Sequence, residues 1–243
     1  MVYSYQFGLQ TLAPALGCVL TISRSLVPLT EVLNVRKDRR LGELNPTPFA
    51  AMILNHTGWV VYAVLHTDWF IFTMDSSGLI IGIWMMFSLY PLAHTQVQNR
   101  LNGLVVVAAI LYCTLALVSM ILNAVNSPAV PLLWGWAVAV TQVLLYAAPL
   151  STLYKAIKAR SSASFHLGMA TLGFLSSAMW TIYGGTESKY FICVPSFLGA
   201  VLTLTAIGVC ALFPRIESGP PTLAAQAQQR MTTIERAVEL QVV

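Results

Sequence analysis

Long apolar runs alternate along this chain with short segments that carry most of the charged residues. A membrane-crossing helix needs about 20 mostly apolar residues, and seven runs reach this length. They cover about residues 7–33, 46–66, 69–93, 103–125, 130–154, 165–185 and 189–214. The pattern predicts an all-α integral membrane protein with seven transmembrane helices. The first run has no basic region before it and no evident cleavage site after it, so we expect a span and not a secretory signal.

The composition excludes a water-soluble fold. Hydrophobic residues make up 57% of the chain and charged residues 9%, whereas soluble domains contain about 25% charged residues. The segments outside the seven runs are too short for an appended enzyme domain. Residues 219–221, Gly-Pro-Pro, end the last helix, and we expect the polar residues 215–243 to form a disordered cytosolic tail.

The basic residues predict the orientation of the helices. Eleven of the thirteen lie in segments on one side of the predicted spans: Arg36, Lys37, Arg39, Arg40, Arg100, Lys155, Lys158, Arg160, Arg215, Arg230 and Arg236. Lys189 falls on the other side, and Arg24 lies inside the first run. Because basic loops stay in the cytosol, we expect a cytosolic carboxyl terminus and an amino terminus outside or in a lumen. The net charge of +4 then needs no nucleic-acid partner.

An internal repeat appears when the chain is compared with itself at an offset of 121 residues. Without a gap, the aligned pairs include Pro28 and Pro149, Lys37 and Lys158, Trp59 and Trp180, Tyr62 and Tyr183, Phe70 and Phe191, and Gly78 and Gly199. Runs one to three therefore repeat as runs five to seven, and run four has no counterpart.

The repeat predicts two parallel three-helix bundles joined by a linker helix, a 3+1+3 arrangement. The first bundle takes residues 1–100, the linker 101–128 and the second bundle 129–214. Two equivalent bundles form a seam near the middle of the membrane, where a polar solute can bind while either side opens. Such an arrangement is typical of a transporter.

Several segments resemble the SWEET (MtN3/saliva) family. PTPFAAMILNHTGWVVYAVLHTDWFIF is similar to the family's second helix and following loop, and APLSTLYKAIKARSS, FLSSAMWTIYG and FICVPSFLG are similar to its fifth, sixth and seventh helices. The resemblance implies a passive, bidirectional uniporter of mono- or disaccharides that works by alternating access. It also implies a plasma or internal membrane, no cofactor, no enzymatic activity and, as in many members, a homo-oligomer.

The resemblance further implies where the pocket and hinges lie. The family's paired pocket positions on the second and sixth helices fall at Trp59 and Trp180. Its paired asparagine positions fall at Asp75 and Ser196, where this chain departs from the pattern. Of the four hinge prolines, three are present and the fourth falls near a histidine: Pro28, Pro48, Pro149 and His166.

The two tryptophans suit a sugar site in their own right. They occupy equivalent places in the repeat, and flat apolar rings match the C–H faces of a pyranose. The alternatives are interfacial anchoring or simple packing of the bundle. Asn55 lies one turn before Trp59 and aligns with Ser176, so we expect it either to contact substrate or to form an interhelical hydrogen bond.

Asp75 is a carboxylate well inside a run, whereas Glu31 lies at the cytosolic end of the first run. Placing a carboxylate inside a run costs about 3 kcal/mol on insertion scales, so it usually faces a cavity or a partner; the alternative is a position near a watery mouth. One hypothesis pairs Arg24 with Asp75 or has it line the same pathway, and the alternative has Arg24 snorkelling or contacting another helix. A protonated Asp75 would allow proton coupling.

Other functions find less support in the sequence. The nearest rival is a related PQ-loop-type carrier of amino acids or another polar solute, coupled to protons. Asp75, which stands where the family has an amide, keeps this alternative open. A seven-helix receptor would not be expected to carry the repeat. The sequence contains neither an H-E-x-x-H nor a G-x-S-x-G motif, so nothing in it indicates a membrane enzyme. The histidines are scattered without ligand spacing, so we expect no metal site.

Overall fold

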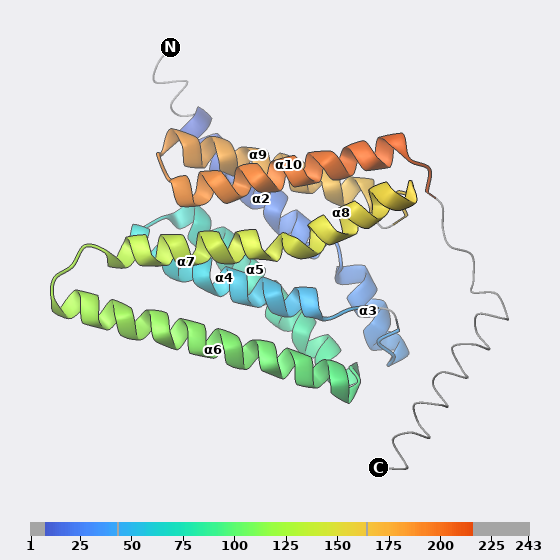
Figure 1. The fold of residues 1–243 in the computed structure, drawn as a ribbon, viewed down its shortest axis with the longest axis horizontal. Coiled ribbons are helices and arrows are strands. Elements are labelled where there is room, and N and C mark those ends of the chain that lie inside the picture. Colours follow the sequence, from blue (N-terminus) through green and yellow to red (C-terminus); the bar gives the residue numbers. More distant parts are fainter. Residues whose placement is uncertain (1–7, 43, 164, 216–243) are drawn as a thin grey trace.

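The chain folds into seven long helical segments in this computed structural model, which describes residues 8–42, 44–163 and 165–215 (Figure 1). The described residues form no strand. The helical elements are η1 (Gly8–Leu12), α2 (Ala13–Leu26), α3 (Leu29–Asp38), α4 (Thr47–His66), α5 (Trp69–Leu89), η2 (Tyr90–Leu92), α6 (Thr95–Ala124), α7 (Val130–Leu145), α8 (Ala147–Ala159), α9 (Leu167–Thr186) and α10 (Tyr190–Leu212).

Local sequence signals set many of the helix ends. Proline occupies the first turn of α2, α4 and α7, where its missing N–H is not needed by the helix. Asp68 caps α5, because its Oδ1 accepts a hydrogen bond of 3.1 Å from the Ile71 N–H. Asp68 thus starts α5 directly after α4 ends at His66 and Thr67 turns the chain.

Two of the long segments are broken at corresponding places. The first breaks between α2 and α3 at Val27 and Pro28. The second breaks at Tyr146, between α7 and α8, three residues before Pro149. A proline cannot donate to the preceding turn, so each break lies where the helical hydrogen bonds are already interrupted.

Left-handed residues recur at the spacing of the sequence repeat. Arg39 ends α3 with φ 54° and Arg160 ends α8 with φ 50°. Thr67 after α4 and Ser188 after α9 have φ values of 53° and 54°. Each pair is 121 residues apart. Positive φ is uncommon outside glycine. Its recurrence at this spacing therefore adds a backbone feature to the identical residues that indicated the repeat.

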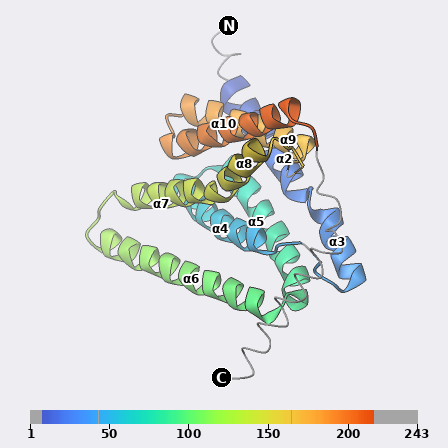
Figure 2. The ribbon, with the colours of Figure 1, turned by 45° about the vertical axis from the view of Figure 1, so that its right-hand side comes forward.

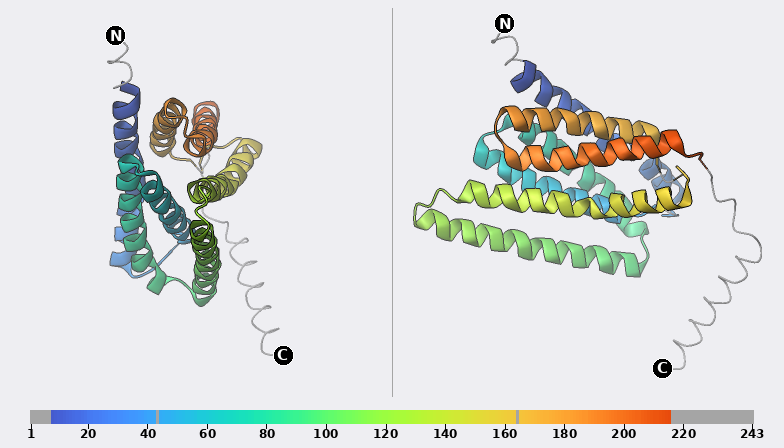
Figure 3. Two further views of the ribbon diagram at one scale, coloured as in Figure 1. Left: turned by 90° about the vertical axis from the view of Figure 1, so that its left-hand side faces the viewer. Right: turned by 45° about the horizontal axis from the view of Figure 1, so that its top comes forward.

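The helices pack in two groups that contact each other. In one group α5 packs against both α2 and α4, and in the other α10 packs against both α7 and α9. Between the groups, α2 packs against α9 and α4 packs against α7. Helix α6 packs against α4 and α7, and it lies at the edge of the bundle away from α9 and α10 (Figure 3).

The predicted all-α membrane fold is confirmed, with differences in detail. Six helical segments of the described chain are long and apolar enough to cross a membrane: Leu9–Asp38, Thr47–His66, Trp69–Leu92, Thr95–Ala124, Val130–Ala159 and Tyr190–Leu212. The predicted span 165–185 corresponds to α9, which is not among the six and is rich in glycine, serine and threonine.

The ends of several elements differ from the predicted runs. The predicted fourth run, 103–125, begins earlier as α6, because the helix already includes the polar residues from Thr95 onward. The first and fifth runs extend through the charged α3 and α8. The 3+1+3 division remains a prediction, and the predicted disorder of residues 215–243 falls outside the described residues except at Arg215.

Candidate functional site

Trp59 and Trp180 lie in one buried cluster and reach across to opposite groups of helices. Trp59 of α4 donates from Nε1 to Gln142 Oε1 of α7 at 3.3 Å. Trp180 of α9 donates from Nε1 to Thr21 Oγ1 of α2 at 3.1 Å. Gln142 and Thr21 are themselves 121 residues apart. The two indole bonds are therefore equivalent contacts, and both join the two groups of helices.

Both tryptophans are tightly enclosed. Trp59 is 8% exposed and Trp180 is 6% exposed. Each ring meets a repeat-related tyrosine edge-on, Trp59 with Tyr62 at 5.4 Å and Trp180 with Tyr183 at 5.8 Å between centroids. A Cβ on Gly17 would lie 3.0 Å from the Trp180 ring. In this conformation the two rings pack against the protein, and a ligand would reach them only after the helices move.

A polar layer lies beside the tryptophans. Thr21 and Ser176 share a hydrogen bond of 2.6 Å between their hydroxyl oxygens, and both are buried. At the position equivalent to Ser176, Asn55 is also buried, and its Nδ2 has no hydrogen-bond partner. A buried amide N–H without a partner is costly. Asn55 thus has an unused donor close in sequence to Trp59.

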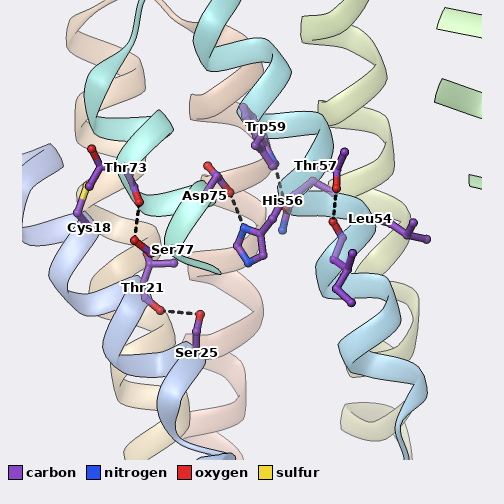
Figure 4. A network of polar contacts seen from close by, with 12 residues as sticks. Cys18, Thr21, Ser25, Leu54, His56, Thr57, Trp59, Thr73, Asp75 and Ser77 are labelled. Carbon is purple, nitrogen blue, oxygen red and sulfur yellow. Dashed lines mark hydrogen bonds and ion pairs between the residues drawn. The ribbon is translucent and has the colours of Figure 1, made fainter. Parts of the chain in front are cut away.

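His56 and Asp75 form a buried pair between α4 and α5. His56 Nδ1 and Asp75 Oδ1 are 2.6 Å apart, and Figure 4 shows the two side chains pointing toward each other. The Asp75 side chain is 1% exposed, and its Oδ2 has no partner. A Cβ on Gly78 would lie 2.5 Å from the imidazole, so only glycine there leaves room for the ring.

The pairing of Asp75 corrects one sequence hypothesis. The carboxylate lies against His56 on the neighbouring α4 and not against Arg24, the partner that the sequence suggested. Arg24 is half-buried, and its Nη1 lies 3.5 Å from where a Cβ on Gly173 of α9 would be. The reason is geometric: α2 directs Arg24 toward α9, whereas α4 and α5 bring His56 to Asp75.

A second charged cluster lies at the α4–α5 and α9–α10 turns. Lys189 Nζ lies 2.7 Å from Asp68 Oδ2, and Tyr183 donates its hydroxyl to the same oxygen at 2.7 Å. Lys189 Nζ also donates to the Tyr183 hydroxyl at 2.8 Å. The side chain of Asp68 is 1% exposed and that of Lys189 is 23% exposed. The cluster joins the α4–α5 turn to the α9–α10 turn.

Sequence reasoning missed this cluster and the role of His56. The signal for the cluster was available: Asp68 and Lys189 have opposite charges and are 121 residues apart. Equivalent residues in two related units meet when they lie near the axis that relates the units. No comparable signal marks His56, whose equivalent, Ser177, has no charge.

The remaining predicted residues fall at or near helix ends and breaks. Pro28 lies at the first break, Pro149 lies in the first turn of α8 three residues after the second break, and Pro48 is in the first turn of α4. His166 is the N-cap residue of α9 without a side-chain capping bond. Ser196 is half-buried and follows the buried Pro195, whose carbonyl accepts a hydrogen bond from Tyr146. Within the described residues no three His, Cys, Asp or Glu side chains gather as metal ligands.

Comparison with known proteins gives one consistent result. The family model described as sugar efflux transporter for intercellular exchange, MtN3/saliva, matches residues 12–96 and 132–217. The bidirectional sugar transporter SWEET7 of Arabidopsis thaliana is 23% identical over 85% of this chain and 81% of its own length. The sugar transporter SWEET1 of Dictyostelium discoideum is 23% identical over 85% and 94%, and SWEET1 of Mus musculus is 26% identical over 82% and 89%.

The fold also matches a solved structure. A eukaryotic SWEET transporter superposes with a TM-score of 0.75 at 17% sequence identity, covering 84% of this chain and 95% of that one. At this identity the likeness concerns the fold. The two matches of the family model begin and end about one repeat apart, on either side of α6.

Proposed function

The chain belongs to the SWEET (MtN3/saliva) family, and on that premise we propose that it is a multi-pass membrane transporter that carries mono- or disaccharides passively and in both directions. The named relatives are sugar transporters over nearly the same length. We further propose that the two groups of helices are the repeats 1–100 and 129–214, joined through 101–128, and that they rock about a site between them. The amino terminus faces outside or a lumen.

The pair of indole hydrogen bonds supports this proposal most directly. Trp59 and Trp180 each bind a polar residue on the first helix of the other group, Gln142 and Thr21. When the groups separate, both indole N–H groups and both ring faces become free at equivalent positions. A pyranose presents apolar C–H faces and hydroxyls to these same groups, so the sugar can replace contacts that the protein makes with itself.

The charged cluster at the α4–α5 and α9–α10 turns serves in this proposal as the closed gate. Entry of a solute from that end requires Asp68 and Lys189 to separate, since their 2.7 Å contact spans the two groups. The exposed part of Lys189 lets water replace the lost contact, which lowers the barrier compared with a fully buried pair. At the opposite end, the breaks at Pro28 and Pro149 would allow α3 and α8 to swing relative to α2 and α7.

Uptake of labelled sugars into transporter-deficient cells tests the proposed substrate class. We expect uptake of at least one mono- or disaccharide, and its loss in Trp59→Ala and in Trp180→Ala. Trp136→Ala is the matched control, because Trp136 is 61% exposed on α7 and lies outside the cluster. Absence of uptake for every sugar, with folded protein in the membrane, would contradict the proposal.

The His56–Asp75 pair favours a second candidate, a proton-coupled carrier of another polar solute. The pair is neutral either as imidazolium with carboxylate or as imidazole with carboxylic acid, and both forms hold the same number of protons. Loss of one proton leaves an unpaired carboxylate in a site that is 1% exposed. A transporter that exposes such a pair to each side in turn would carry one proton with each cycle.

A pH gradient distinguishes the two candidates. In sealed liposomes, a proton-coupled carrier accumulates its solute when the outside is acidic, and His56→Gln and Asp75→Asn abolish this accumulation. His94→Gln is the control, because His94 is exposed at the start of α6. A uniporter equilibrates sugar at the same final level with or without the gradient, and this is the result that our first proposal predicts.

A further inference from the structure

A pocket away from the cluster of Trp59 and Trp180 lies between α3 and the end of α5. It has a volume of about 440 Å³. Its lining includes two basic side chains, Arg36 and Arg39, and four apolar or aromatic ones, Trp84, Phe87, Pro91 and Leu92. Figure 2 shows α3 projecting from the end of α2, and α3 packs against α5. The pocket therefore has one wall on the segment beyond the Pro28 break and one wall on a helix of the first group.

Two arginines line the pocket without a carboxylate partner among the described residues. Arg36 and Arg39 are both exposed, and neither forms an ion pair with a carboxylate of the described residues. The guanidinium carbon of Arg36 lies 5.3 Å from the centre of the Trp84 ring, which holds this side chain at the pocket. Guanidinium groups present paired N–H donors that match phosphate oxygens.

The position of the pocket relates it to the membrane surface. It lies where two membrane-crossing segments end, Leu9–Asp38 and Trp69–Leu92. The Phe87 side chain is 78% exposed and turns an aromatic ring outward beside the arginines. Aromatic and basic residues together are typical of the level of the lipid headgroups, and basic pockets between helices there suit phosphorylated headgroups.

We propose that this pocket binds the phosphorylated headgroup of an anionic lipid. Arg36 and Arg39 contact the phosphate, while Trp84, Phe87 and Pro91 lie against the glycerol and the first part of the acyl chains. A free phosphate ion would use the two arginines only and leave the apolar part of the lining in contact with water. The exposed Phe87 therefore favours a lipid over a soluble phosphate as the ligand.

The second half of the chain lacks the same set of residues. At the equivalent positions, 121 residues later, Arg39 is matched by Arg160, but Arg36 becomes Ile157, Trp84 becomes Thr205 and Phe87 becomes Gly208. The proposed site is therefore single in a molecule with a repeat. A lipid bound there links α3 to α5 on one side, so it would restrain the segment beyond the Pro28 break and not its counterpart, α8.

Lipid retention by the full-length protein tests the proposal. The protein is reconstituted in phosphatidylcholine nanodiscs with and without phosphatidic acid, and bound lipid is counted by native mass spectrometry. We expect the wild type to retain one phosphatidic acid molecule, and the Arg36→Gln/Arg39→Gln variant to bind it about tenfold more weakly. The matched control, Lys37→Gln/Arg40→Gln, removes the same charge from neighbouring residues outside the pocket and should retain the lipid.

Two further comparisons separate the alternatives. Phe87→Glu places a carboxylate beside both arginines at an exposed position and should also release the lipid, without relying on removal of an arginine. Glycerol phosphate, the soluble arm, should not displace the lipid. Equal weakening by the two double variants would show a general basic surface and overturn the proposal, as would displacement by glycerol phosphate or the absence of a retained lipid in the wild type.

Discussion

At the scale of single residues, Asp68 illustrates how one side chain can serve several contacts. Its Oδ1 caps α5 through the Ile71 N–H, and its Oδ2 accepts from both Lys189 and Tyr183. The carboxylate is buried, whereas the lysine reaches solvent. Removing either member of the ion pair should therefore have unequal effects, because only one of the two remaining groups can be solvated.

Lys189→Met should destabilise the closed arrangement more than Asp68→Asn does. The lysine variant leaves a buried carboxylate with the Tyr183 hydroxyl as its remaining side-chain partner, at a cost of about 1–3 kcal/mol. We expect a lower thermal midpoint in detergent. We also expect faster modification of the buried Cys18 by a thiol reagent, in a background where the other three cysteines are alanine.

The double variant, Asp68→Asn/Lys189→Met, provides the control for this gate. It leaves no unpaired buried charge, so part of the stability lost in Lys189→Met should return. Equal Cys18 reactivity in the wild type, both single variants and the double variant would be inconsistent with a gate at this cluster.

Gly78→Ala should disturb the His56–Asp75 pair. The added Cβ would lie 2.5 Å from the imidazole, so the ring must move away from the carboxylate, at a cost of about 1–3 kcal/mol. Gly103→Ala on α6 is the matched control, since no atom lies within 4 Å of its Cβ position. The loss is measured as a lower thermal midpoint in detergent. In an Asp75→Asn background, Gly78→Ala should lower the midpoint by less; an equal drop in both backgrounds would mean that packing alone accounts for the loss.

At the scale of helices, close packing between α9 and α10 depends on Gly184. A Cβ there would lie 2.6 Å from the backbone nitrogen of Cys193 and 2.9 Å from its Cα. Backbone atoms cannot rotate away as a side chain can. The two helices are therefore held at a separation that only glycine permits, a common use of small residues in membrane proteins.

Gly184→Ala should lower the thermal midpoint markedly, because α10 must shift as a whole. Gly208→Ala, on the half-buried part of α10 where the added Cβ meets open space, should leave the midpoint unchanged or raise it slightly, since alanine favours a helix over glycine by about 1 kcal/mol. Thermal unfolding of the two variants in one detergent makes the comparison. Similar midpoints for both would show that the α9–α10 separation is less restrictive than the structure implies.

At the scale of the whole molecule, the repeat made much of the architecture predictable. Helix positions followed from apolar runs, and the offset of 121 residues indicated that Trp59 and Trp180 are equivalent. Their partners, Gln142 and Thr21, could not be predicted, because packing between the two groups depends on the tilt and rotation of helices that no single run specifies. For the same reason the sequence could not identify His56, which lies 19 residues earlier on the preceding helix, as the partner of Asp75.

Sugar exchange by the purified protein shows directly whether the chain carries sugars passively and in both directions. The protein is sealed into liposomes preloaded with an unlabelled sugar, and entry of the labelled sugar is followed at equal pH on both sides. We predict rapid exchange that needs no gradient, that is lost when Trp59 and Trp180 are both alanine, and that persists in Trp136→Ala. Exchange no faster than in protein-free liposomes, for every mono- and disaccharide tested with folded protein, would show that the chain is not a sugar transporter of this kind.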